Sequence, residues 1–203
     1  VDVIDNFSTG NKWAVNNCSV YDIDLLNIDA LNNILSQNNY KAVFHFAAKS
    51  VVKDSFLLEQ EYYDNNVIAS KNLLECMLKY NMKNIIFSSS ASVFGQVKSK
   101  KIDESYPKIP LNPYGKTKLE FEQILSKASS KFNINAVILR YFNVAGADES
   151  GKIGELHKPE THLIPSIFNS LTDENNVLKI YGNDHNTRDG TCIRDYIHVN
   201  DVI

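Results

Sequence analysis

Short apolar, β-branched segments alternate along this chain with longer segments in which apolar residues recur at helical spacing. The strand pattern appears at residues 1–5, 18–22, 42–48, 84–90 and 136–142, and the helical pattern at 25–37, 57–80 and 114–132. This alternation predicts an α/β fold built as a doubly wound parallel sheet. The last three strand segments are continuously apolar, so we expect them in the centre of the sheet with both faces buried.

The composition changes after residue 143. Gly146, Gly151 and Gly154 stand there among polar residues, an amphipathic helix is predicted at 163–171, and a short strand at 178–181. We therefore expect a second, smaller part of the protein to begin at residue 144.

Composition and charge narrow the range of functions. The chain has 203 residues, of which 43% are hydrophobic and 22% charged, which is typical of a globular protein. The net charge is −3 and the basic residues are scattered, so we expect neither nucleic acid nor a membrane surface as a partner. Three distant cysteines without C-x-x-C spacing indicate a reducing compartment, which favours a cytoplasmic location.

The hydropathy of the chain and the residue patterns at its two ends lead to two further expectations. It has no apolar run of about eighteen residues and no basic leader, so we predict neither a membrane span nor a secretory signal. The chain starts with Val1 and at once follows a strand pattern, and it stops within an apolar pattern, so we expect the protein to extend at both ends.

Polar residues follow the first predicted strand, where ligands of open parallel sheets bind. A carboxylate such as Asp5 at this position accepts hydrogen bonds from an adenosine ribose and repels a 2′-phosphate, which favours NAD over NADP. A turn stabilised by the Asp5 and Asn6 side chains is an equally weighted alternative. His45 is expected to pack in the core, and because His157 and His162 lack zinc-type spacing, we assign no metal site.

The strongest local signal combines Ser88 and Ser90, at the end of a strand, with Tyr114 and Lys118 at the start of a helix. Tyrosine and lysine four residues apart share a helix face, but about one such pair is expected by chance, so the position carries the information. A tyrosine acting as base near pH 7 needs its pKa lowered by about three units, which Lys118 and an oxidised nicotinamide could supply. The Ser90 hydroxyl would hold a substrate alcohol.

Six sequence blocks resemble a known family. They are H-F-A-A at 45–48, Y-Y-D-N-N-V at 62–67, F-S-S-S-A-S-V-F-G at 87–95, P-Y-G-K-T-K at 113–118, L-R-Y-F-N-V-A-G-A at 139–147, and the block at 181–199 that ends in G-T-C-I-R-D-Y-I-H-V. In these blocks the chain resembles the NAD-dependent epimerase/dehydratase family of the extended short-chain dehydrogenase/reductase superfamily, and most narrowly its nucleotide-sugar 4-epimerases.

The resemblance implies an enzyme that interconverts UDP-glucose and UDP-galactose by reversible oxidation at C4, with NAD as cofactor, a UDP-hexose as substrate and a homodimer as the assembly. It implies that Tyr114 is the catalytic base, Lys118 its partner, and Ser90 the substrate-orienting hydroxyl. The residues expected to bind NAD are Asp5, Asn6, Asp22, Ile23, Phe46, Ala47, Ser50, Asn65, Ser88, Tyr114, Lys118 and Phe142. Those expected to bind the substrate are Ser90, Asn143, His162, Leu163, Tyr181 and Arg194.

The resemblance also implies a Rossmann-like NAD-binding domain at 1–143, whose first strand and Gly-rich turn would precede Val1. Residues 144–203 would form part of the substrate-binding region, with their end returning toward the NAD domain. Two positions depart from the family pattern: Ser50 follows Lys49 where some members place a lysine, and His162 replaces an asparagine.

Three alternatives to this activity stay open. The first is a UDP-N-acetylhexosamine 4-epimerase. The second is a sugar 4,6-dehydratase, which is disfavoured because Ala91 and Ser92 stand where an Asp-Glu pair is expected. The third is a non-catalytic NAD-binding relative. Without the Gly-rich turn, the 203 residues alone are expected to retain NAD poorly and to be inactive.

Overall fold

The computed structural model describes residues 1–15, 18–97, 101–173 and 175–203. The chain forms two compact units, Val1–Tyr141 and Phe142–Ile203. The division lies two residues before the boundary expected at 143. The roles assigned to the two parts, NAD binding and substrate binding, remain predictions.

The first unit contains two parallel sheets. Strand β1 (Asp2–Asp5) pairs with β2 (Ser19–Asp22), and β3 (Val43–His45), β4 (Asn84–Ser88) and β5 (Asn135–Leu139) form a second sheet in the order β3-β4-β5. Four of the five predicted strand segments contain one of these strands, and β5 begins one residue before the fifth segment, so the parallel α/β architecture is confirmed.

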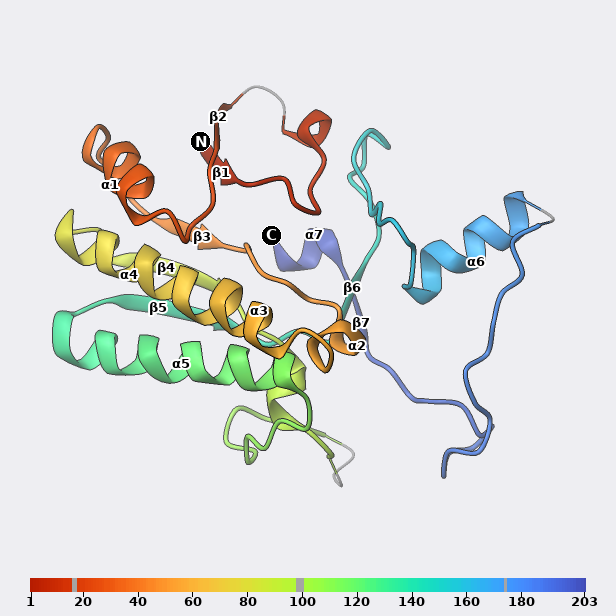
Figure 1. Ribbon diagram of the computed structural model, residues 1–203. Helices are drawn as coiled ribbons and strands as arrows, with labels where there is room; N and C mark the ends of the chain where they lie inside the picture. The colour runs from red at the N-terminus through yellow and green to blue at the C-terminus, as the bar shows by residue number, and fades with distance from the viewer. Residues whose placement is uncertain (16–17, 98–100, 174) are drawn as a thin grey trace. The chain divides into compact units, whose positions relative to one another are not determined.

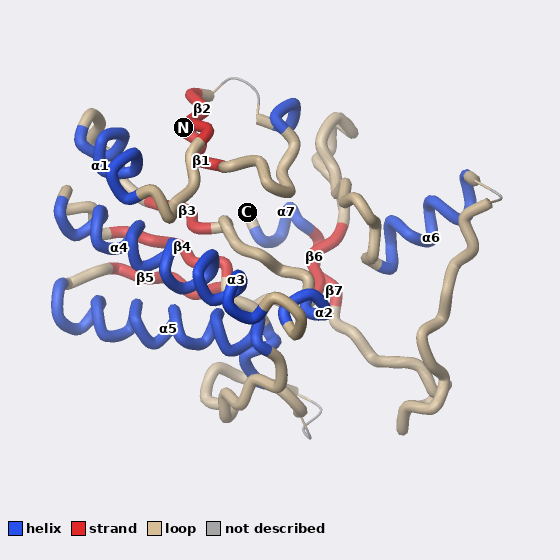
Figure 2. The backbone as a smooth tube through the Cα atoms, viewed as in Figure 1, coloured by secondary structure: helices blue, strands red, loops and turns tan. Residues whose placement is uncertain are grey.

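Three helices cover one face of the three-stranded sheet: α1 (Ile28–Ser36), α4 (Ala69–Lys79) and α5 (Pro113–Phe132), which lie side by side in Figure 1. Figure 2 shows the strands beneath them. The core between the helices and the strands holds fully buried apolar side chains, among them Leu31, Met77, Ile85, Phe87, Phe121 and Leu125. Burial of these side chains is the main stabilising term of the unit.

The prediction that the three apolar strands are buried on both faces is wrong for β3 and β5. Phe44 in β3 is 61% exposed and Val137 in β5 is 53% exposed, and Ile86 of the central β4, which is in register with both, is half-buried; Ile85 and Phe87, on the opposite face of β4, are buried. Successive side chains of a strand point to opposite faces. Among the described residues the helices cover one face of this sheet, so the other face keeps its apolar side chains exposed.

The long helix predicted at 57–80 is divided. The short helix α2 (Val52–Ser55) comes before it, and α3 (Glu59–Tyr63) then passes through a π-helical turn (Asp64–Ile68) into α4. Such turns insert one residue into a helix and recur at functional sites. Here the turn carries the buried Asn66, whose amide nitrogen donates to the Lys49 carbonyl at 2.9 Å and to the Thr117 hydroxyl at 3.1 Å. It thereby connects this helix to the second turn of α5. Two 3₁₀ turns, η1 (Lys12–Ala14) and η3 (Ala91–Phe94), complete the unit.

The second unit contains a parallel pair, β6 (Asn143–Ala145) with β7 (Tyr196–His198), and the helices α6 (Leu163–Thr172) and α7 (Val199–Val202). The helix predicted at 163–171 is confirmed. The strand predicted at 178–181 is wrong: this segment is irregular, and Ile180 and Tyr181 are 74% and 91% exposed. Within the described residues no strand runs beside it to receive its backbone hydrogen bonds.

Over the described ranges, none of the helices combines the length and the apolar character that crossing a bilayer requires.

Candidate active site

The start of α5 carries two of the predicted catalytic side chains. The Asn112 side chain accepts a hydrogen bond from the backbone N–H of Gly115 at 2.7 Å, as expected for the N-cap of this helix. This cap fixes where the helix begins. Tyr114 and Lys118 therefore lie one turn apart, and both are buried, with 8% and 3% of their surface exposed.

The Ser90 hydroxyl meets the Tyr114 phenol. Ser90 follows β4 and caps η3, where its hydroxyl accepts a hydrogen bond from the backbone N–H of Ser92 at 3.1 Å. It is also hydrogen-bonded to the Tyr114 side chain. Gly115 permits the close approach of η3 and α5, because a Cβ at this position would lie 2.7 Å from the Ser92 carbonyl oxygen.

The Lys118 ammonium lies near the Tyr114 ring and the end of β4. Its Nζ donates to the Ser88 carbonyl at 2.9 Å and lies 5.8 Å from the centre of the Tyr114 ring. The structure thus brings Ser88, Ser90, Tyr114 and Lys118 together at the carboxyl end of β4. We call Ser90, Tyr114 and Lys118 the Ser–Tyr–Lys cluster.

Burial shifts both ionisable groups of this cluster toward their neutral forms. Burial raises the pKa of Tyr114 to about 12, against the opposing effect of its hydrogen bond with Ser90. Burial lowers the pKa of Lys118 to about 7. In this structure, therefore, Lys118 does not lower the pKa of the phenol below its ordinary value of about 10. Proton abstraction near neutral pH requires a further positive charge.

A second polar group supports the strand end, and the sequence analysis did not single it out. Glu122 is 4% exposed, accepts a short hydrogen bond from the Ser89 hydroxyl, and pairs with both Nε and Nη2 of Arg140 at 2.8 Å each. The Tyr141 phenol is hydrogen-bonded to the Ser88 hydroxyl. One signal was available: a glutamate four residues after Lys118 lies on the buried face of α5.

The residues expected to hold the adenosine end of NAD lie at the ends of β1 and β2. Asp5 and Asp22 are paired in the register of these strands, and Asp5 accepts a hydrogen bond from the backbone N–H of Phe7 at 2.7 Å. The Asn6 amide donates to Asp24 at 2.8 Å. Asp22 is paired with Lys12 at 2.5 Å. Asn6, Asp5 and Asp22 therefore form one polar edge, whereas Ile23 packs partly against the core.

Three more predicted cofactor residues follow β3. Phe46, Ala47 and Ser50 are exposed, as an apolar and sterically open surface for a flat ring requires. Asn65 donates to Asn66 at 3.0 Å beside the same segment. These features together fit the chemistry of a dinucleotide: the Asp5 carboxylate can accept hydrogen bonds, Phe46 and Ala47 provide aromatic and small side chains, and Lys118 provides a buried ammonium.

Three of the predicted substrate residues share a pocket in the second unit. Asn143, His162 and Leu163 line it together with Glu155 and Tyr196. Tyr181 and Arg194 are exposed and are not among its lining residues, so the structure does not gather them with the other three. Phe142, predicted to contact NAD, also belongs to the second unit.

The fold and the Ser–Tyr–Lys cluster define a Rossmann-like protein of the short-chain dehydrogenase/reductase kind. The chain belongs to the NAD dependent epimerase/dehydratase family, which matches residues 1–203. It is 43% identical over 202 residues to a UDP-glucose 4-epimerase of Halalkalibacterium halodurans, covering 100% of this chain and 60% of that protein. The chain thus spans about 60% of the length of this curated relative.

Two solved structures are similar over almost the whole chain. The UDP-glucose 4-epimerase of Brucella ovis in complex with NAD has a TM-score of 0.92 and 41% identity, covering 99% of this chain and 62% of that one. The Bifidobacterium longum enzyme in complex with NAD⁺ and UDP has a TM-score of 0.94 and 38% identity, covering 100% and 64%. These likenesses bear out the predicted family and its Rossmann-like fold.

Proposed function

We propose that the whole protein interconverts UDP-glucose and UDP-galactose with NAD as its cofactor. The observation that carries this proposal is the buried Tyr114 phenol, hydrogen-bonded to Ser90, with the Lys118 ammonium one helical turn away. The activity named for the similar proteins supports it. The fit of the polar strand ends to a dinucleotide supports the cofactor.

The proposed reaction assigns a separate task to each member of the cluster. When bound, NAD would supply a reversible hydride acceptor for C4 of the sugar and a positive charge that favours a phenolate nearby. Ser90 holds the O4 hydroxyl of the sugar in line with Tyr114, which takes the proton and later gives it back. Lys118 adds positive charge beside the phenolate whenever it is protonated.

The remaining predicted residues complete this proposal as binding groups. Asp5, Asn6, Asp22, Ile23, Phe46, Ala47, Ser50, Asn65, Ser88 and Phe142 would contact NAD, and Asn143, His162, Leu163, Tyr181 and Arg194 the UDP-sugar. We further propose a homodimer in the cytoplasm. The cytoplasmic location is supported by Cys18, Cys76 and Cys192, all free thiols.

The test is the substitution Tyr114→Phe in the whole protein. It removes the proton acceptor and keeps the ring, so we expect turnover of UDP-galactose to fall by about 10²–10⁴-fold. Binding of the UDP-sugar, measured by calorimetry, should change less than about threefold, since the lost hydroxyl acts mainly in the transition state. The matched control is Tyr63→Phe, which removes a hydroxyl bonded to Glu120 at 3.0 Å.

The same assay separates the alternatives. Turnover of UDP-N-acetylglucosamine in preference to UDP-glucose would favour the acetylated substrate, and release of a 4-keto-6-deoxy product would favour a dehydratase. Tight NAD binding without turnover of any of these sugars would overturn the proposal in favour of a non-catalytic protein. Near-normal turnover by Tyr114→Phe would remove Tyr114 as the base.

A further inference from the structure

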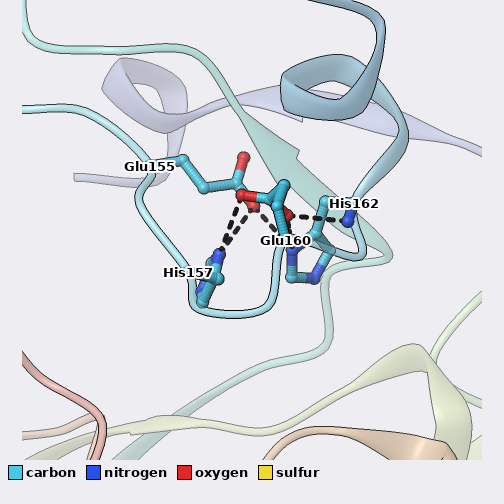
Figure 3. Close-up of side chains that lie close together, drawn as sticks. All are labelled: Glu155, His157, Glu160 and His162. Atoms are coloured by element: carbon cyan, nitrogen blue, oxygen red, sulfur yellow. Dashed lines mark hydrogen bonds and ion pairs between the residues drawn. The ribbon is translucent and has the colours of Figure 1, made fainter. Parts of the chain in front are cut away.

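Four metal-ligating side chains converge in the loop before α6. They are Glu155, His157, Glu160 and His162, and one candidate ligand atom from each lies within 4.8 Å of all the others (Figure 3). Nδ1 of His162 lies 2.8 Å from Glu155 and 3.2 Å from Glu160. Nδ1 of His157 lies 3.5 Å and 3.6 Å from the same two carboxylates. The sequence spacing had not pointed to a metal because these residues are not on one helix or strand.

We call these four residues the Glu/His loop cluster. Its two carboxylates carry negative charge that a positive group between them would neutralise. The side chains of Glu155 and Glu160 are 19% and 13% exposed, so two carboxylates are held close together largely out of water. Both imidazoles turn the same atom, Nδ1, toward them. Either protons on the two rings or one divalent cation can satisfy this arrangement. A single cation between the four atoms satisfies all of them at once.

The distances suit a small tetrahedral ion. Zinc binds imidazole nitrogen and carboxylate oxygen at about 2.0–2.2 Å, which places neighbouring ligand atoms about 3.3–3.6 Å apart. The two distances from His157 Nδ1, 3.5 Å and 3.6 Å, lie in this range, whereas the two from His162 Nδ1, 2.8 Å and 3.2 Å, are shorter. Glu160 also accepts hydrogen bonds from the backbone N–H groups of Thr161 and His162 at 2.8 Å each, so its carboxylate is already oriented.

We propose that Glu155, His157, Glu160 and His162 bind one divalent transition metal ion of the zinc type. The ion ties the loop at 155–162 to the N-cap of α6, which is His162. Glu155 and His162 also line the pocket next to Asn143 and Leu163, so the ion fixes one wall of that pocket. The site is structural and takes no part in the proposed hydride chemistry. With its ring on the ion, His162 would serve the pocket by shaping its wall and not by direct contact with the UDP-sugar.

The experiment is a zinc titration of the untagged protein after removal of metal by a chelator. The whole protein carries Cys192→Ser, which removes the exposed thiol as a competing ligand. Zn²⁺ binding is measured by competition with a chromophoric chelator, and the ligand-field absorption of Co²⁺ reports tetrahedral coordination. The test variants are His157→Asn and Glu155→Gln, and the matched control is His185→Asn, which alters an exposed histidine outside the cluster.

We expect one Zn²⁺ per chain, bound at least about tenfold more weakly by each test variant and unchanged in His185→Asn. Zinc should also raise the thermal midpoint of the parent and of His185→Asn but not of the test variants. Equal melting of all variants without metal would show that the test variants fold. Equal affinity of His157→Asn and the parent, or an equal loss in His185→Asn, would overturn the site.

Discussion

The ammonium of Lys118 lies 5.8 Å from the centre of the Tyr114 ring, and burial shifts the pKa values of the two groups in opposite directions, so that each favours its neutral form. The pKa of the phenol rises to about 12 and that of the ammonium falls to about 7. The fold alone therefore does not prepare a phenolate. In the proposed enzyme, binding of a positively charged nicotinamide becomes the event that makes Tyr114 a base, so proton abstraction is coupled to cofactor binding.

Removing the ammonium should move the pH dependence of catalysis. In Lys118→Met, a phenolate at Tyr114 loses a nearby positive charge, so the acidic limb of the kcat/KM profile should shift to higher pH by at least about one unit. The profile of the whole enzyme is measured with UDP-galactose from pH 5 to 10. Lys116→Met, an exposed lysine on the same helix, should leave the limb in place. An unshifted limb in Lys118→Met would show that the lysine does not act on the phenol.

The same substitution should stabilise the protein. The pKa of Lys118 is about 7 in the folded chain against an ordinary 10.5, so the unfolded chain holds this proton more tightly. The resulting cost to stability is complete below pH 7 and disappears as the pH rises toward 10.5. Lys118→Met should therefore raise the thermal midpoint most at pH 6 and less at pH 9. A lower midpoint than the parent at pH 6 would contradict this reasoning.

Local signals were enough to predict the positions of the side chains proposed to be catalytic. The helix predicted at 114–132 is observed as α5, which begins at Pro113 with Asn112 as its N-cap. The Ser-ended strand at 84–90 was equally clear from its apolar run. Since parallel strands place their carboxyl ends at one edge, the meeting of Ser90 and Tyr114 followed from the order of strand and helix alone.

Features that depend on distant partners could not be predicted in this way. Leu178 and Ile180 alternate with polar residues as in a strand, but a strand also needs a neighbour, and the described residues provide none beside them. Likewise, His157 and His162 lie in an irregular loop, whose path no periodicity encodes. The bidentate pair of Glu122 with Arg140 joins α5 to the end of β5; helical spacing places Glu122 on the buried face of α5 but does not indicate which cation it meets there.

The buried His45 should make the protein sensitive to acid. Burial, and secondarily the charge of Lys118, lower its pKa to about 3, so the unfolded chain binds a proton more readily below pH 6.5. Stability is then lost as the pH falls from 6.5 toward 3, by about 1.4 kcal/mol per pH unit at most from this group. His45→Gln cannot take up the proton, and it offers an amide in place of the ring nitrogen that lies 2.7 Å from the Ser70 hydroxyl.

We therefore expect the free energy of unfolding of His45→Gln to vary less between pH 6.5 and 4.5 than that of the parent. Urea denaturation at several pH values measures this. The variant loses ring contacts with Phe87 and Phe121, so its stability at pH 7 should be lower, and the slope with pH is the informative quantity. The exposed His185→Gln should keep the parent slope. Identical slopes in His45→Gln and the parent would assign the acid sensitivity to other groups.

The pair formed by Glu122 and Arg140 should hold the Ser88–Ser90 segment in place. Glu122→Gln leaves Arg140 without its carboxylate and weakens the bond to the Ser89 hydroxyl, so we expect a loss of about 3 kcal/mol in the free energy of unfolding. Arg140→Met leaves the buried carboxylate unpaired and should cost about as much. The control Glu120→Gln, on the same helix, should change stability by less than about 0.5 kcal/mol.

A double-mutant cycle isolates the interaction. Once either partner of the Glu122–Arg140 pair is lost, removing the other should cost little, so the double variant should be more stable than the sum of the single losses predicts, by about 1–3 kcal/mol.

Because the pair supports the serine segment and does not contact a substrate in the proposed reaction, kcat should fall in Glu122→Gln while KM for the UDP-sugar stays near the parent value. Additive stability losses, or a change confined to KM, would mean that the pair does not position the Ser90 hydroxyl for Tyr114.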